Sequence, residues 1–132
     1  MKLRDDEERR VERETLLPAS PDEVWEALTD ADRLAEWLAP EVEIEPYEGG
    51  EIAVRDSDGE RSGTVETVIE EERLTFTWSR PGDAPSRVDL IVEAIPAGTR
   101  LVVVETGPTA LAAAGWSRRL LSLGRVFALL PA

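Results

Sequence analysis

A glutamate stands near the end of an apolar run, where its side chain could reach the interior of the protein. The run Leu101-Val102-Val103-Val104 predicts a strand, and successive side chains of a strand point to opposite faces. If Leu101 and Val103 face the core, Glu105 faces it as well; if Val102 and Val104 do, Glu105 faces solvent. A carboxylate inside an apolar pocket could act as an acid, a base or a ligand anchor. The sequence leaves both registers open.

Other catalytic chemistry finds little support in the composition. The chain has no His and no Cys, so it lacks the usual general base near neutral pH, thiolate nucleophiles and the ordinary ligands of zinc. We therefore predict no catalytic residue, no cofactor and no metal.

Two local patterns resemble ligand loops but have the wrong spacing. Asp56, Asp58 and Glu60 are arranged like half of a calcium loop, yet Gly59 comes too early in the pattern. We expect a solvated hairpin tip there, because Asp-Gly is a strong hairpin signal. The pair Gly49-Gly50 lacks the lysine and the helix that follow a phosphate-binding loop.

Explicit start and stop signals in residues 18–40 predict two short helices. Ser20 and Glu23 form an S-x-x-E capping box. Asp30 can cap the second helix, and Pro40 ends it. We expect these helices at about residues 21–28 and 31–38.

Alternating side chains predict strands over most of the chain after Pro40. The clearest signal is Leu74, Phe76 and Trp78, which alternate with polar residues. The expected strands are residues 11–17, 42–45, 51–55, 62–69, 74–79, 87–95 and 100–106.

A final helix is expected from about Thr109. One apolar stripe runs along it at helical spacing, formed by Trp116, Leu120, Leu123, Phe127 and Leu130. The dry face of the sheet needs a cover, and this helix is the one element long enough to supply it. We predict an α+β fold in which a curved antiparallel sheet of six to seven strands grips the final helix. The two short helices after the first strand close one end.

The net charge of −13 over 132 residues argues against nucleic acid as a partner, which needs a basic face. No apolar run is long enough for a membrane span, and the charged N-terminus does not fit a signal peptide. We expect a single cytoplasmic domain over residues 1–132, with 1–10 flexible, that is a monomer or weak dimer. Residues 107–132 are basic, which would let the final helix dock on the acidic remainder; their charged residues are Arg118, Arg119 and Arg125.

The order of these segments resembles a known family. The segments are VWEALTDADRLAEWLAP, EPYEGGEI, GTVETVIEEERLTFTW, GTRLVVVETG and GWSRRLLSL. They are similar to the bacterial homologues of the heat-shock-protein-90 ATPase activator, within the START and birch-pollen-allergen-like (SRPBCC) superfamily. The resemblance covers about residues 11–127. It implies a helix-grip fold with an apolar pocket between the sheet and the long helix.

The resemblance also implies which residues face that pocket. They are mostly aromatic and aliphatic, as in many ligand pockets: Trp37, Leu38, Phe76, Trp78, Val88, Leu90, Trp116 and Leu120, with Glu105 added if it points inward. The alternative is a filled core, because a stripe at helical spacing is more often packing than a binding site. Trp25 is expected to pack the short helices in place.

We expect the protein to bind a small apolar molecule in this pocket. One alternative is a cyclase or hydrolase that uses the same pocket. Another is an interaction protein that modulates a chaperone ATPase, which would make a protein its partner.

Overall fold

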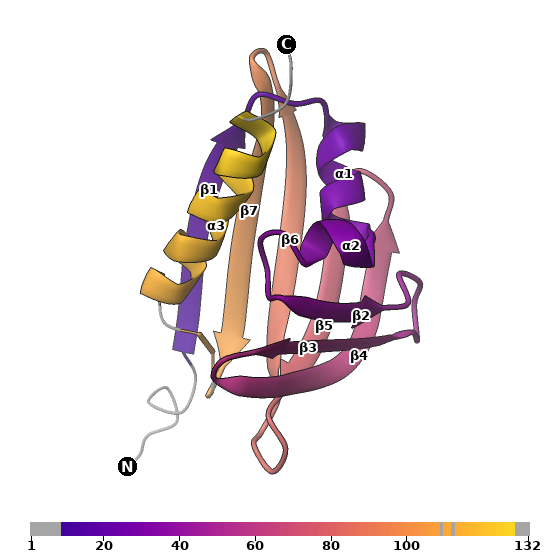
Figure 1. Ribbon diagram of the computed structural model, residues 1–132. Coiled ribbons are helices and arrows are strands. Elements are labelled where there is room, and N and C mark those ends of the chain that lie inside the picture. Colours follow the sequence, from indigo (N-terminus) through magenta and orange to yellow (C-terminus); the bar gives the residue numbers. More distant parts are fainter. Residues whose placement is uncertain (1–8, 109, 112, 129–132) are drawn as a thin grey trace, which may run out of the picture.

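Seven antiparallel strands form one curved sheet in the order β1-β7-β6-β5-β4-β3-β2 (Figure 1). The structure is a computed structural model that describes residues 9–108, 110–111 and 113–128. The strands are β1 (Arg9–Leu17), β2 (Glu41–Ile44), β3 (Glu51–Asp56), β4 (Gly59–Ile69), β5 (Arg73–Ser79), β6 (Ser86–Ile95) and β7 (Gly98–Gly107).

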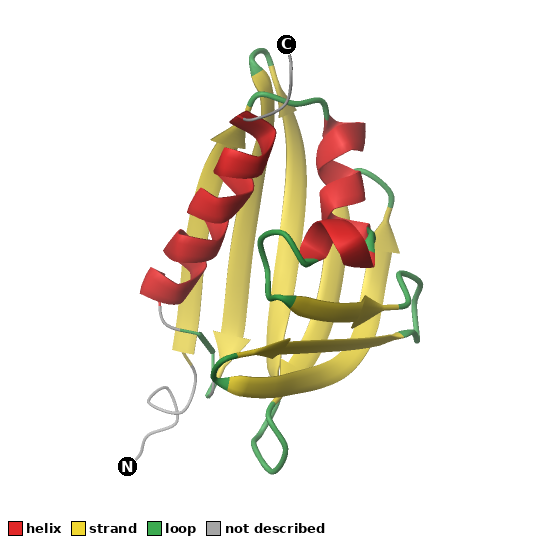
Figure 2. Cartoon of the chain, viewed as in Figure 1, coloured by secondary structure: helices red, strands yellow, loops and turns green. Residues whose placement is uncertain are grey.

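Three helices cover one face of this sheet (Figure 2). They are α1 (Pro21–Thr29), α2 (Ala31–Leu34) and α3 (Ala113–Ala128). Helix α3 runs along β1 and β7, whereas α1 and α2 lie over the middle of the sheet. The predicted helix-grip α+β fold is confirmed. No helix within the described ranges is both long enough and apolar enough to cross a bilayer.

Strand β4 bends sharply, so that the β3–β4 hairpin folds across the front of the sheet toward α3 (Figure 1). At Gly63 an added Cβ would lie 1.8 Å from the carbonyl oxygen of Thr77, so the backbones approach more closely than any side chain permits. The pairing with β5 also shifts between Val65 and Thr67, as at a β-bulge. The glycine and the bulge together bring the hairpin tip to α3.

Helix α1 begins as its sequence predicts. The Glu23 carboxylate accepts a hydrogen bond from the backbone N–H of Ser20 at 3.0 Å, the contact expected of an S-x-x-E capping box. The Asp30 side chain accepts from the backbone N–H of Asp32 at 3.0 Å and starts α2.

The second helix is shorter than predicted, because α2 ends at Leu34 and not near residue 38. The N–H groups of Glu36 and Trp37 bond to the carbonyls of Arg33 and Leu34, three residues back. These tighter turns replace the α-helical pattern and lead the chain toward Pro40. They also place the Trp37 side chain in the core, where its Nε1–H donates to the carbonyl of Ala27 at 2.9 Å.

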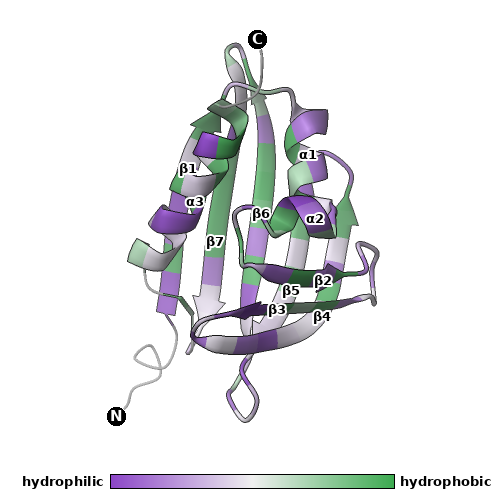
Figure 3. Ribbon diagram, viewed as in Figure 1, coloured by the Kyte–Doolittle hydropathy of each residue, from purple (hydrophilic) through white to green (hydrophobic). Residues whose placement is uncertain are grey.

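The final helix buries the predicted apolar stripe, whose described members are Trp116, Leu120, Leu123 and Phe127. They pack onto the concave face of the sheet, where apolar strand residues alternate with polar ones that face outward (Figure 3). The expected helix start at Thr109, the stripe residue Leu130 and residues 1–8 lie outside the described residues. Of the stretch 1–10 that we expected to be flexible, Arg9 and Arg10 belong to β1 and pair with β7, so the expectation is wrong for them.

Candidate functional site

Glu105 faces the interior of the fold. On β7 the side chains of Leu101, Val103 and Glu105 are buried, and Glu105 has 0% exposure. Val102 and Val104 are half-buried on the other face. Of the two registers that the sequence left open, the one with Val102 and Val104 inside is therefore wrong.

The buried carboxylate accepts four hydrogen bonds from three different parts of the chain. One oxygen accepts from Trp78 Nε1–H at 2.8 Å and from the Ser86 hydroxyl. The other accepts from Trp116 Nε1–H at 2.8 Å and from the backbone N–H of Leu111 at 2.9 Å. Both oxygens are thus occupied by protein donors. In this conformation the carboxylate ties β5, β6 and the start of α3 to β7, and it has no surface left for a substrate.

The two indoles held by Glu105 form the centre of an aromatic cluster. Trp78 and Trp116 stack with their ring centroids 6.1 Å apart and their planes at 21°. Phe76 meets Trp78 edge-on at 5.2 Å. The Arg61 guanidinium lies 5.4 Å from the Trp78 ring centroid, within cation–π range. Stacked and edge-on rings are the favoured geometries of aromatic pairs, so this aromatic cluster is well packed.

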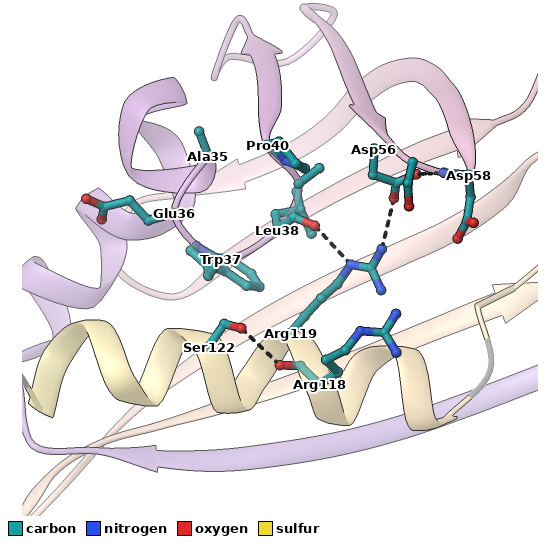
Figure 4. A pocket seen from close by; sticks show the side chains of 12 residues that line it. Ala35, Glu36, Trp37, Leu38, Pro40, Asp56, Asp58, Arg118, Arg119 and Ser122 are labelled. Carbon is teal, nitrogen blue, oxygen red and sulfur yellow. Dashed lines mark hydrogen bonds and ion pairs between the residues drawn. The ribbon is translucent and has the colours of Figure 1, made fainter.

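A surface pocket of about 370 Å³ opens where α3 meets the hairpin tip and the loop after α2 (Figure 4). The buried side chains of Trp37 and Leu38 form part of its lining. Arg118, Arg119 and Ser122 come from α3. The remaining lining residues come from the loop after α2 and from the hairpin tip: Ala35, Glu36, Ala39, Pro40, Asp56, Ser57 and Asp58.

Arg119 connects the three segments that form the walls of this pocket: α3, the loop after α2 and the β3–β4 hairpin tip. Its Nε–H donates to the carbonyl of Leu38 at 3.0 Å, and its NH1 group donates to the carbonyl of Gly115 at 3.0 Å. Its NH2 group lies 3.2 Å from a carboxylate oxygen of Asp56 at the hairpin tip. Burial lowers the pKa of Arg119, and the Asp56 carboxylate opposes that shift. The guanidinium therefore ties the hairpin and the loop after α2 to the helix.

The hairpin tip is only partly the solvated turn that we expected. Asp58 and Glu60 are exposed, but the Asp56 side chain is 23% exposed and paired with Arg119. Asp56 also accepts from the backbone N–H of Asp58 at 2.8 Å. Within the described ranges no group of acidic residues has the arrangement of a metal site.

The predicted pocket residues separate into two sets. Trp37 and Leu38 line the surface pocket, and Leu120 lines a second groove, between β1 and α3. The others are core residues with at most 2% exposure: Phe76, Trp78, Val88, Leu90, Glu105 and Trp116. In the sheet Val88 pairs with both Phe76 and Glu105, and so sits beside the aromatic cluster.

Sequence reasoning missed Arg61 as a member of these sites, and it named Arg119 only as one of the charges that could dock the final helix on the acidic remainder, the kind of contact that Arg119 makes with Asp56. Arg61 precedes Gly63 by two residues on β4, so it shares the inner face with that bend. Arg119 follows Trp116 at helical spacing, so it lies beside the buried stripe. The sequence therefore places both side chains next to buried residues, but it does not show which residues, distant in sequence, they contact.

Comparison with solved structures shows the same architecture in several bacterial proteins. MLL2253 from Mesorhizobium loti superposes with a TM-score of 0.84 at 23% identity, covering 94% of this chain and all (100%) of that one. The Aha1 dimer from Colwellia psychrerythraea superposes with a TM-score of 0.75 at 19% identity, covering 92% of this chain and 97% of that one. At these identities the likeness shows the fold.

A third similar structure is DynU16, described as a putative protein in the dynemicin biosynthetic locus. It superposes with a TM-score of 0.81 at 28% identity over 91% of this chain. This chain covers 47% of DynU16, about half of its length.

No curated protein matches this chain. Residues 18–128 match the family described as Activator of Hsp90 ATPase homolog 1-like protein. These residues include both helices after β1, the sheet from β2 onward and the whole of α3. The chain therefore belongs to the Activator of Hsp90 ATPase homolog 1-like family.

Proposed function

We propose that this protein binds a small, largely apolar molecule between α3 and the sheet. The pocket beside Trp37 and Leu38 carries this proposal, because it opens at the edge of the helix–sheet interface. Its volume of about 370 Å³ lies within the range of sites for small molecules, roughly 300–1,000 Å³. The bulky apolar side chains of Trp37 and Leu38 lie there beside charged and hydroxyl-bearing residues, and such polar groups can orient a ligand whose body contacts the apolar part.

The aromatic cluster supports a deeper binding mode. Phe76 and Trp78 on β5 and Trp116 on α3 are buried between the sheet and the helix, so a ligand would reach them when the helix moves away from the sheet. Apart from Glu105, the residues that the resemblance assigned to the pocket form this apolar interior or its edge. A biosynthetic locus as the setting of DynU16 also favours a small organic molecule.

Filling the pocket tests this function. Ser122 lines the pocket from α3, so Ser122→Phe places a ring in the space that the ligand would occupy. The probe is N-phenyl-1-naphthylamine, an uncharged fluorophore that brightens in apolar sites. We expect wild-type protein to bind it and Ser122→Phe to bind it at least about tenfold more weakly, a loss of ~1.4 kcal/mol.

The matched control is Ala114→Phe, which adds the same ring at an exposed position of α3 outside this pocket. It should leave the affinity unchanged. If wild-type protein does not bind the probe, or if both variants bind it as the wild type does, the proposed site is wrong.

The family description favours a second candidate, the stimulation of a chaperone ATPase. We would measure ATP hydrolysis by a bacterial heat-shock-protein-90 chaperone with and without this protein. A rate that rises with added protein and saturates supports this candidate. An unchanged rate over a wide range of concentrations opposes it.

The enzyme alternative finds less support. Glu105 was the one candidate acid or base, and its oxygens are occupied by four protein donors. A catalytic group must come within hydrogen-bond reach of its substrate.

A further inference from the structure

The pocket beside α3 brings two arginines together in an otherwise acidic protein, although three carboxylates also line it. Arg118 and Arg119 are consecutive on α3, and both line the pocket. Figure 4 shows their guanidinium groups on the same side of the pocket, with the Glu36 carboxylate pointing to the other side. Arg61 and Arg118 both act to lower the pKa of Arg119, as expected of like charges nearby.

The two guanidinium groups differ in how they are used. Arg119 is committed to Leu38, Gly115 and Asp56. Arg118 is exposed, and among the residues that the structure describes its side chain forms no ion pair or hydrogen bond. Its donors are therefore free for a group that enters the pocket.

The overall negative charge of the protein restricts where an anion can bind. With a net charge of −13, the long-range field of the protein repels anions. That field is screened beyond about 8 Å at physiological salt, so the charged groups nearest to the bound anion decide whether it binds. Among the lining residues, Asp56 is neutralised by Arg119, whereas Asp58 and Glu36 stay as competing charges. The Glu36 carboxylate points away from the two guanidinium groups (Figure 4).

We propose that Arg118, supported by Arg119, recognises the anionic head group of the ligand, and that the ligand is an amphipathic monoanion. Its apolar body lies along Trp37 and Leu38, and its carboxylate-type oxygens face the guanidinium of Arg118. This inference rests on the proposed function, because it names the ligand class of the same site. Guanidinium groups suit such anions because their N–H donors match the geometry of two oxygens.

Two fluorophores with one skeleton separate charge recognition from apolar binding. They are 8-anilinonaphthalene-1-sulfonate, which is anionic, and N-phenyl-1-naphthylamine, which lacks the sulfonate. We expect Arg118→Gln to weaken binding of the anionic probe about three- to fivefold, the upper range for an exposed ion pair. Binding of the neutral probe should not change.

The matched control is Arg125→Gln, which removes the same charge from an exposed site of α3 outside the pocket. Asp58→Asn removes one competing carboxylate and should strengthen binding of the anionic probe. Thermal unfolding by circular dichroism verifies that each variant is as folded as the wild type.

The outcomes distinguish this inference from the proposed function. If Arg118→Gln and Arg125→Gln weaken the anionic probe equally, or neither does, head-group recognition is wrong while apolar binding stands. The same holds if wild-type protein binds only the neutral probe. If it binds neither probe, the proposed function fails, and this inference fails with it.

Discussion

Glu105 shows how a charged residue can belong to a core. A carboxylate buried without partners would strongly destabilise the fold, but every hydrogen bond here comes from a protein donor. The donors belong to Trp78, Ser86, Leu111 and Trp116, so one side chain organises both indoles and the approach to α3. Its hydrogen bonds to both indoles make it a positioning residue for the aromatic cluster.

We predict that Glu105→Gln destabilises the protein by about 2 kcal/mol or more. The amide has one oxygen, so its NH₂ group must face one of the two donor pairs, and each unsatisfied buried donor costs roughly 1–3 kcal/mol. Urea unfolding followed by tryptophan fluorescence measures the change. Glu66→Gln, on an exposed part of β4, is the control; an equal effect of both substitutions would contradict the anchor role.

At the scale of elements, the bend of β4 decides where the pocket forms. The β3–β4 hairpin reaches α3 because β4 bends at Gly63 and the following bulge. The Asp56–Arg119 pair then holds the hairpin tip against the helix. The loop after α2 is held by the same guanidinium through the carbonyl of Leu38. One wall of the pocket therefore depends on a glycine that is distant from it.

Two glycine-to-alanine substitutions should have opposite effects. Gly63→Ala places a methyl group against the backbone of Thr77, at 1.8 Å before relaxation, and should destabilise the protein by several kcal/mol, above the typical range of ~0.5–3 kcal/mol. Gly124→Ala lies inside α3 with no atom within 4 Å of the new Cβ, and should stabilise it by about 0.5–1 kcal/mol.

Urea midpoints of the two variants and the wild type provide the measurement. If Gly63→Ala leaves the midpoint unchanged, β4 does not need the close approach. A lower midpoint for Gly124→Ala would mean that α3 requires glycine there.

At the scale of the whole molecule, repulsion between the many negative charges destabilises the folded state. The net charge is −13, and compact acidic chains repel themselves. Many carboxylates are exposed without an ion pair among the described residues, such as Glu43, Glu48, Glu66 and Glu70. Pairs such as Arg119 with Asp56 offset this repulsion locally.

We therefore predict that the free energy of unfolding rises with sodium chloride between ~0.01 and ~0.1 M, as the screening length falls from about 30 Å to about 10 Å. Urea unfolding at each salt concentration measures the rise. A variant with Glu43, Glu48, Glu66 and Glu70 all replaced by Gln should show a smaller rise. A salt dependence that is equal in both proteins would mean that self-repulsion is not the cause.

The sequence by itself determined the order of elements, the capping of α1 and the apolar faces of the strands and of α3. These features depend on neighbours along the chain, through side-chain periodicity and hydrogen bonds to nearby backbone groups. The end of α2 was placed too late, because the N–H groups of Glu36 and Trp37 bond to carbonyls three residues back, not four, where the Trp37 side chain enters the core.

The tertiary structure alone decided the inward register of Glu105, its four donors and the joining of three walls by Arg119. These contacts link residues far apart in sequence, such as Arg119 with Leu38 and Asp56. Periodicity specifies a face but not the residue that meets it across the core. That choice depends on the bend of β4 and on the docking of α3, which are properties of the assembled sheet.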